Sequence, residues 1–324
     1  MGNRFSLKQD KKKKKKPPPR LMIIGDPGIG KTTFATNAEK PVIIATESGS
    51  IATSVHTLPR DGTCKTWQDV VDSVDALLGE EHNYKSVAID TLDNAVSLLE
   101  KHVCDTEFGG VMNASRGKEG FNSFGKGNAV VAQRLKEFLH TKLDTLQARG
   151  LQVILLSHTG TVKVSNSLAL DFTACAASLP KQSLSVVNAW CDQIAHACSD
   201  IRVIQREGEK NKAQSIGTER WLVFEPEPGR MVKSRIGYEM PSKIPFSYSN
   251  YSEALTKDTA KLEATKCLGL LSVVSQETVN AAIDSLKKQS SSKISEIKDI
   301  DEDVLTALGS EKLKQLNNWL LTKA

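Results

Sequence analysis

Residues 21–34 read LMIIGDPGIGKTTF, and this stretch decides the fold that the sequence predicts. The four apolar residues Leu21 to Ile24 indicate a buried strand. The pattern G-x-x-x-x-G-K-[ST] then runs from Gly25 to Thr32 and matches at every fixed position, between a strand signal and a helix signal. In such a loop, successive backbone N–H groups and the positive end of the following helix bind phosphate. The stretch therefore predicts a phosphate-binding loop of the P-loop type.

The loop also supplies two side chains with defined chemistry. Lys31 is expected to reach the β- and γ-phosphates of a nucleoside triphosphate, and the Thr32 hydroxyl is expected to ligand Mg²⁺. ATP and Mg²⁺ are therefore the expected cofactors. The competing interpretation is a glycine-rich turn without a ligand, which would match the Lys-Thr pair only by chance. The residues predicted to bind the nucleotide are Gly25, Asp26, Pro27, Gly28, Ile29, Gly30, Lys31, Thr32 and Thr33.

Composition places the chain among soluble globular proteins. It has 324 residues, of which 25% are charged and 5% are aromatic. No run approaches about 18 consecutive apolar residues, so we expect no membrane-spanning helix and no membrane partner. The start of the chain lacks the apolar stretch of a secretory signal, which predicts a cytoplasmic protein, in the host cytoplasm if a phage encodes it. The six cysteines form no CxxC pair, which argues against a disulfide framework.

Residues 1–19 form a basic, proline-rich start that we expect to be disordered. The six lysines Lys11 to Lys16 account for the formal net charge of +5, and without them it is −1. Nucleic acid would therefore bind along a local basic groove rather than a broadly positive surface. The lysine run could itself act as a phosphate-binding arm. The opening Met-Gly-Asn-x-x-Ser also matches the N-myristoylation pattern.

Three further strand signals end in residues that could work on a nucleotide. Glu47 lies just beyond an apolar run that ends at Ala45, and a second run ends at Asp90. A third run, residues 152–157, is followed by His158. The carboxyl ends of parallel strands meet at one edge of a sheet, where functional groups cluster. Asp90 is therefore a candidate Mg²⁺-binding acid of the Walker B type, although it could also be a helix N-cap, and a lone His158 could equally be structural.

Alternating strand and helix signals predict an α/β fold with a mainly parallel sheet covered by helices. We expect a RecA-like ATPase domain over residues 20–251 and a small helical module over residues 252–324. The predicted helices cover residues 32–39, 66–78, 129–148 and 182–198, with one more running through Leu99 that Thr91 or Asp93 caps. Late strands over 201–206 and 221–225 are expected to extend the sheet in antiparallel fashion.

Residues 105–128 lose the helical period and form a long predicted loop. Such a loop in a compact domain is usually functional or mobile. Its basic and aromatic side chains have the composition of a single-strand-binding loop, and a plain flexible lid is the alternative. The residues concerned are Arg116, Lys118, Phe121, Phe124 and Lys126.

The ordered set of the P-loop, Glu47, Asp90 and His158 resembles a RecA-like ATPase. It is most similar to phage nucleotide-binding proteins of the Sak type, core-only recombinase relatives implicated in single-strand annealing. The resemblance covers about residues 20–247. It implies that Glu47 polarises the attacking water, that Asp90 is the Walker B acid, and that His158 occupies the sensor position.

The resemblance extends to three further segments. Residues 124–127 resemble an aromatic-Gly-Lys-Gly stretch that precedes a helix in this group. In hexameric relatives a Lys-x-Arg pair reaches the γ-phosphate of the neighbouring subunit, and Lys233 with Arg235 matches that pattern. By position, residues 159–167, with Lys163, are a second candidate DNA-binding segment. The implied partners are single-stranded DNA and other copies of the chain in a ring or filament.

Three functional hypotheses follow. The first is an ATPase that assembles on single-stranded DNA for recombination or annealing. The second is an ATP-driven switch or loader whose helical tail docks on a protein such as a helicase or a single-strand-binding protein. The third is a small-molecule kinase, which is disfavoured because no arginine-rich lid is evident and Glu47 stands where a RecA-like base would be.

Overall fold

The computed structural model divides the chain into two compact units. The first comprises residues 1–236 and 241–250, and the second comprises residues 237–240 and 251–324. The structure describes residues 17–48, 55–114, 119–164, 171–205, 213–225, 229–236, 240–256, 267–272, 275–289, 305 and 310–321.

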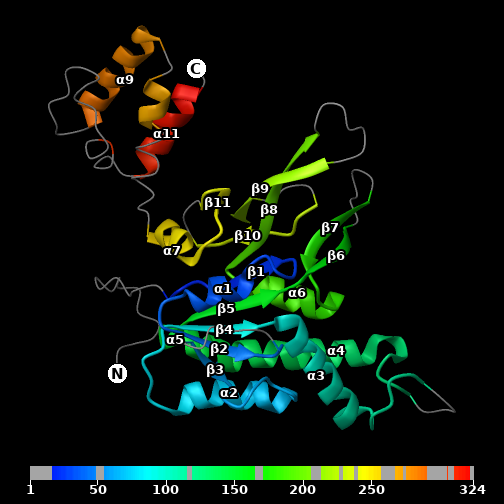
Figure 1. Cartoon of the computed structure of the whole chain (residues 1–324). Helices are drawn as coiled ribbons and strands as arrows, with labels where there is room; N and C mark the ends of the chain where they lie inside the picture. Colours follow the sequence, from blue (N-terminus) through cyan, green and yellow to red (C-terminus); the bar gives the residue numbers. More distant parts are fainter. Residues whose placement is uncertain are drawn as a thin grey trace. The chain divides into compact units, whose positions relative to one another are not determined.

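The first unit is built on a nine-stranded sheet in the order β11-β9-β8-β1-β5-β4-β2-β3, with β10 paired to β8 (Figure 1). From β3 to the start of β8 the neighbouring strands are parallel, and the pairs formed by β9, β10 and β11 are antiparallel. The predicted α/β fold with an antiparallel extension is therefore confirmed. The strands of this sheet are β1 (Leu21–Gly25), β2 (Pro41–Ala45), β3 (His56–Leu58), β4 (Ser86–Asp90), β5 (Gln152–Ser157), β8 (Gln193–Gln205), β9 (Ala213–Val223), β10 (Lys233–Ser234) and β11 (Lys243–Pro245).

Helices cover both faces of this sheet, which is why β1, β4 and β5 are buried along their whole length. On one face, Met22 and Ile24 pack into a core with residues of α2, α3, α4 and α6. On the other, α1 contacts β2 and β5, and its Phe34 stacks on Phe246 with ring centroids 5.4 Å apart. The helices of the unit are α1 (Lys31–Thr36), α2 (Trp67–Gly79), α3 (Leu92–Glu107), α4 (Lys126–Phe138), α5 (Asp144–Ala148), α6 (Lys181–Trp190) and the start of α7 (Tyr248–Thr256).

Two shorter features complete the first unit. Strands β6 (Thr159–Val164) and β7 (Phe172–Ala177) form a separate antiparallel pair directly after β5. A π-helical turn (Leu139–Leu143) joins α4 to α5, so the predicted helix over 129–148 contains an irregular turn. Helix α4 begins at Lys126, three residues before the predicted start, and the predicted loop shortens accordingly.

The predicted helix over residues 182–198 is wrong in its second half. Helix α6 ends at Trp190, and the backbone of Cys191 is extended. Strand β8 then begins at Gln193 and pairs in parallel with β1, from Leu21 with Gln193 to Gly25 with Ala197. The open edge of β1 offers unpaired N–H and C=O groups, and this pairing overrides the local helical pattern.

The described residues of the second unit are mainly helical and form a core of their own. Helices α9 (Gln276–Gln289) and α11 (Ser310–Leu321) and the helical residues 267–271 contribute to it. The buried apolar residues of this core are Cys267, Leu271, Val279, Ala282, Ile283, Leu305, Leu313 and Leu320. Among the described residues no helix is both long enough and apolar enough to cross a bilayer.

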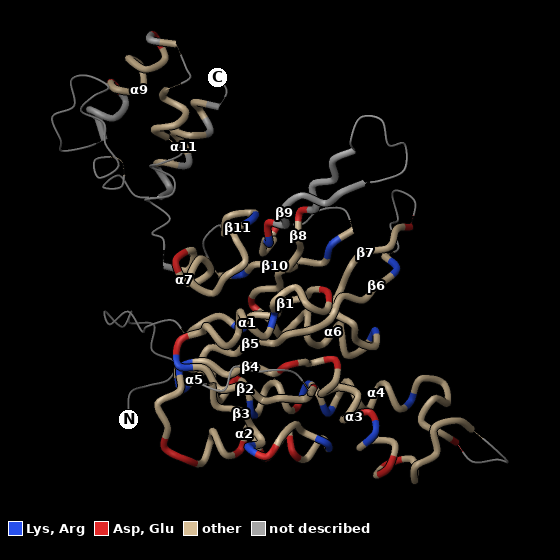
Figure 2. The backbone as a smooth tube through the Cα atoms, viewed as in Figure 1, with Lys and Arg blue, Asp and Glu red and all other residues tan. Residues whose placement is uncertain are grey.

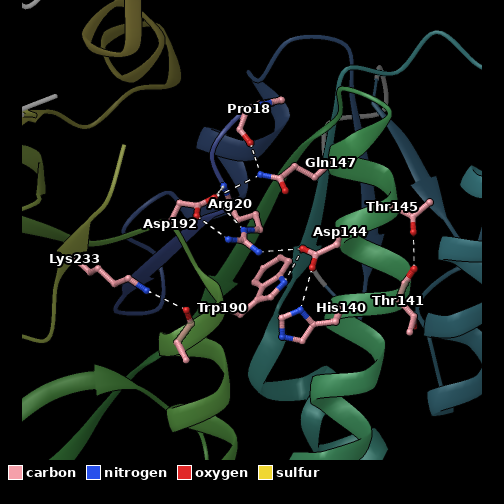
Figure 3. A network of polar contacts seen from close by, with 11 residues as sticks. Pro18, Arg20, His140, Thr141, Asp144, Thr145, Gln147, Trp190, Asp192 and Lys233 are labelled. Carbon is pink, nitrogen blue, oxygen red and sulfur yellow. Dashed lines mark hydrogen bonds and ion pairs between the residues drawn. The ribbon is translucent and has the colours of Figure 1, made fainter. Parts of the chain in front are cut away.

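A polar network fixes the start of β1 (Figure 3). The Arg20 guanidinium donates to both carboxylate oxygens of Asp192, at 2.7 and 3.0 Å, and to Asp144 Oδ1 at 3.0 Å. Trp190 Nε1 donates to the same Asp144 oxygen at 2.9 Å, and the guanidinium lies 4.9 Å from the Trp190 ring centroid. Burial raises the pKa of Asp192, but the hydrogen bonds from Arg20 outweigh it and the net pKa is lowered. The network therefore stabilises the fold above the ordinary pKa of an aspartate and weakens as the pH falls through the lowered value.

We expect Arg20→Ala to lower the free energy of unfolding by about 2 kcal/mol, because it leaves two half-buried carboxylates without their charged donor. The measurement is urea unfolding at pH 7. Arg134→Ala is the matched control, since Arg134 makes exposed ion pairs with Glu107 and Glu137 that are worth about 0–1 kcal/mol. Equal effects of the two substitutions would contradict a stabilising role for this network.

Candidate active site

The glycine-rich loop after β1 has the backbone conformation of an anion-binding turn. Gly28 and Gly30 have φ of +78° and +110°, values that residues other than glycine rarely adopt. Gly30 is the N-cap residue of α1, so the loop leads straight into the helix with its free N–H groups. The parallel strands β5 and β8 flank β1 and place this loop in the middle of the carboxyl edge of the sheet.

Lys31 lies folded against this loop. Its Nζ donates to Gly25 O at 2.7 Å and to Asp26 O at 3.1 Å, and the residue is 6% exposed. Burial lowers the pKa of Lys31, while Asp90 and other carboxylates oppose the shift. The ammonium is therefore held by backbone carbonyls at the loop, close to where a phosphate would bind.

Thr32 and Asp90 meet as the sequence predicts. The Thr32 hydroxyl donates to Asp90 Oδ2 at 2.6 Å, which joins the first turn of α1 to the end of β4. Burial raises the pKa of Asp90, and the hydrogen bond from Thr32 lowers it. A hydroxyl and a carboxylate oxygen are ligands that Mg²⁺ accepts while it keeps several waters, so the pair fits this ion.

Glu47 lies next to the end of β4. Its Oε1 accepts a hydrogen bond of 2.6 Å from the Thr91 hydroxyl. The preceding backbone is tied to the same strand end, because Thr46 N donates to Asp90 O at 2.8 Å. The Glu47 carboxylate is thus held beside Asp90, the predicted Walker B residue, with its second oxygen not engaged by Thr91.

His158 completes this group. Its Nδ1 lies 2.7 Å from Asp93 Oδ2 and 3.7 Å from Glu47 Oε1, and its backbone N donates to Asp93 Oδ1 at 3.1 Å. Ligand atoms of Glu47, Asp93 and His158 all lie within 4.8 Å of one another. Nδ1 faces carboxylates, so it is the nitrogen that carries the proton when the ring is neutral. Nε2 then remains as the ring atom for a ligand or water.

Asp93 and Thr91 have roles that differ from the predicted ones. Both were candidate N-caps of the helix that became α3, yet Thr91, at the N-cap, makes no side-chain capping hydrogen bond. Thr91 instead orients Glu47, and Asp93 orients His158. Spacing along the chain could not show this, because β5 brings His158 to Asp93 from 65 residues away.

One of the predicted DNA-binding residues, Phe121, lies differently from expectation. Phe121 is 3% exposed and packs against Phe108, so its prediction as a base-stacking residue is wrong. The bare backbone of Gly127 permits this packing, since a Cβ there would lie 2.4 Å from the Phe121 ring. Lys126 is exposed and forms an ion pair of 2.5 Å with Glu119.

The remaining DNA-binding candidates are exposed or outside the description. Phe124 is 97% exposed, with a φ of +52°. Lys163 is exposed on β6, the strand that begins immediately after His158. Arg116 and Lys118 lie outside the described residues.

Lys233 and Arg235 lie away from the loop of their own chain. Strand β10 pairs Lys233 with Ile194 and Ser234 with Gln193, at the start of β8, whereas the loop follows the end of the parallel strand β1. Lys233 Nζ donates to Asn188 O and Ala189 O at the end of α6. An action of this pair on a neighbouring subunit stays a prediction.

Comparison with known proteins identifies a family for most of the first unit. The model of a family described as an AAA domain matches residues 17–236. No curated protein sequence gives a significant match to the chain.

Two substitutions separate binding from turnover at this site. We expect Lys31→Ala to abolish ATP binding, because it removes the cation at the loop, and Glu47→Gln to keep binding while losing turnover. Equilibrium binding of a fluorescent ATP analogue and release of phosphate measure the two steps. Wild-type turnover in Glu47→Gln would remove Glu47 from the mechanism.

Proposed function

The chain belongs to the AAA-domain family of P-loop ATPases, and from that premise we propose that it hydrolyses ATP and acts on single-stranded DNA in recombination or annealing. The observation that supports hydrolysis best is the approach of three strand ends to one loop. Asp90 contacts Thr32 directly, and Glu47 and His158 lie beside Asp90. This is the arrangement that the Sak-type resemblance implies, with Glu47 as the base.

In this proposal the residues act on a triphosphate lying along the loop. Lys31 and the backbone N–H groups bind the phosphates, and Glu47 orients the attacking water. Thr91 holds one oxygen of Glu47, which leaves the other for that water. Bound Mg²⁺, held by Thr32 and Asp90, would neutralise phosphate charge. His158, oriented by Asp93, would accept through Nε2 a hydrogen bond from a water beside the terminal phosphate.

A link to DNA is supported by the position of the β6–β7 hairpin. Strand β6 starts at Thr159, so Lys163 lies on an element that continues directly from the sensor residue His158. A change in the hairpin on binding DNA could therefore reach His158 without an intermediate element. The exposed ring of Phe124 offers a stacking surface for a base.

The charge distribution agrees with a local DNA contact. Basic and acidic positions are interspersed through the described part of the first unit (Figure 2). A sequence-independent contact would then depend on single lysines and exposed rings rather than on a wide basic face. Assembly on DNA would also let Lys233 and Arg235 of one copy approach the nucleotide of the next, in a ring or filament.

We expect Phe124→Ala to weaken binding of an oligo(dT) strand by ~10-fold, since stacking on an aromatic ring contributes about 1–3 kcal/mol per base. Lys163→Ala should lower the slope of log affinity against log salt by about 0.7, as expected for one lost phosphate contact on a single strand. Fluorescence anisotropy at several salt concentrations measures both quantities.

Met112→Ala is the matched control for Phe124. Met112 is also a large, exposed apolar residue of the same loop region, but it has no aromatic ring. Its removal should leave DNA binding unchanged. If wild-type protein bound no DNA at low salt, the DNA part of this proposal would be wrong.

The second candidate is an ATP-driven loader that docks on a replication or recombination protein through its C-terminal helices. The separate core of the second unit favours it, because a module with its own core can serve as a docking domain. Trp319 of α11 is partly exposed, and tryptophan is enriched at protein interfaces.

For the loader, we expect a chain that ends at Thr256, the last residue of α7, to lose its partner and keep its ATPase activity. Binding to a purified single-strand-binding protein and phosphate release are measured on the same preparation. Loss of both properties together would speak against a separate docking role.

A further inference from the structure

Arg220 of β9 lies against the phosphate-binding loop, and no sequence motif includes it. A Cβ built on Gly30 would lie 3.2 Å from Arg220 Nη1 and 3.6 Å from Phe246 Cε1. The guanidinium therefore lies next to the last glycine of the loop, on the side where a Cβ would point, immediately before Lys31. A Cβ at position 30 would require the guanidinium to shift by a few tenths of an ångström.

The sheet holds Arg220 at this level. Strand β8 pairs Ala197 with Gly25 of β1, and two residues later it pairs Ser199 with Arg220 of β9. Arg220 O accepts a hydrogen bond of 2.9 Å from Phe246 N. Phe246 in turn stacks on Phe34 of α1, the helix that directly follows the loop. This stacking holds the backbone of Arg220 close to α1.

Arg220 has no ion pair within the described part of the chain. Among the described residues no carboxylate pairs with its guanidinium, whereas Arg20 and Arg134 each bind two acids. The guanidinium lies beside a loop that presents backbone N–H groups and leads into Lys31. A further cation beside these N–H groups favours an anion bound at the loop. The geometry thus indicates a place for a polyanion at the loop.

We propose that Arg220 is a nucleotide-binding residue that contacts the phosphate chain of ATP bound to the same subunit. The proposal rests on the proposed nucleotide site and adds a cation to it from the antiparallel part of the sheet. Arg220 differs in this from Lys233 and Arg235, which lie at the opposite edge and would have to act on a neighbour.

The experiment measures displacement of a fluorescent ATP analogue by ATP and by inorganic tripolyphosphate, with full-length protein and Mg²⁺. Arg220→Ala should weaken both competitors by ~10-fold or more, since a hydrogen bond to a charged group contributes that much to binding. Arg220→Lys should lose less, because a lysine keeps the charge but not the two parallel donors. Arg134→Ala, which removes an exposed arginine on α4, should match the wild type.

The outcomes distinguish this inference from the proposed function. If the wild type binds ATP and Arg220→Ala binds both competitors equally well, the inference is overturned while the site stands. If Arg220→Ala weakens ATP but not tripolyphosphate, Arg220 contacts the nucleoside and the phosphate assignment is wrong. If the wild type binds neither competitor, the proposed function and the inference both fail. The melting temperature of each variant is measured as well. A value equal to that of the wild type shows that the substitution leaves the fold intact.

Discussion

The parallel pairing of β1 between β5 and β8 is the constraint on which the site depends. It places the end of β1 in the centre of the sheet, so the loop from Gly25 opens between two neighbouring strand ends. β5 lies between β1 and β4. Thr32, in the first turn of α1, nevertheless donates a hydrogen bond to Asp90 at the end of β4. With another strand order, the Thr32 hydroxyl and the Asp90 carboxylate would not lie within hydrogen-bond distance of each other.

The site holds buried charged groups at a desolvation cost that hydrogen bonds from the protein offset in part. Lys31 and Asp90 are both buried, and burial disfavours the charged form of each, as the directions of their pKa shifts indicate. Backbone carbonyls satisfy the ammonium, and the Thr32 hydroxyl satisfies the carboxylate. These hydrogen bonds hold the side chains near their working positions, so less reorganisation is needed when phosphate binds.

Much of this arrangement could be predicted from the sequence, because it follows from local patterns. The run before Gly25 and the strand that ends at Asp90 are continuous apolar stretches, which read as strands buried on both faces. The position of β5 over residues 152–157 was predicted to the residue. The family match over residues 17–236 confirms that the P-loop pattern marks an ATPase domain.

The errors occur where contacts between distant segments decide the structure. Residues 193–198 have a helical pattern but form a strand, because β1 offers an open edge for them. Phe121 has the exposed, loop-like context of a stacking residue, yet the missing side chain of Gly127 lets it enter the core. Asp93 could be found only once β5 had placed His158 beside it. Arg220 belongs to the same class, since the pairing of β9 with β8 carries it to the loop.

Lys233 and Arg220, the two further sources of positive charge, differ in the interactions that each would lose on contacting a phosphate. To contact a phosphate, Lys233 would have to break its hydrogen bonds to the carbonyl groups at the end of α6. The helix would then also lose a positive charge that interacts favourably with its negative C-terminal end. Arg220 gives up no acidic partner among the described residues when it turns toward a phosphate. A cation that needs no bond broken contributes its full electrostatic gain to nucleotide binding, whereas one already bound contributes only the difference. On these grounds Arg220 belongs to the binding of ATP within one chain. A contribution from Lys233 would become favourable only when assembly with a second copy provides further contacts to offset the ones it gives up.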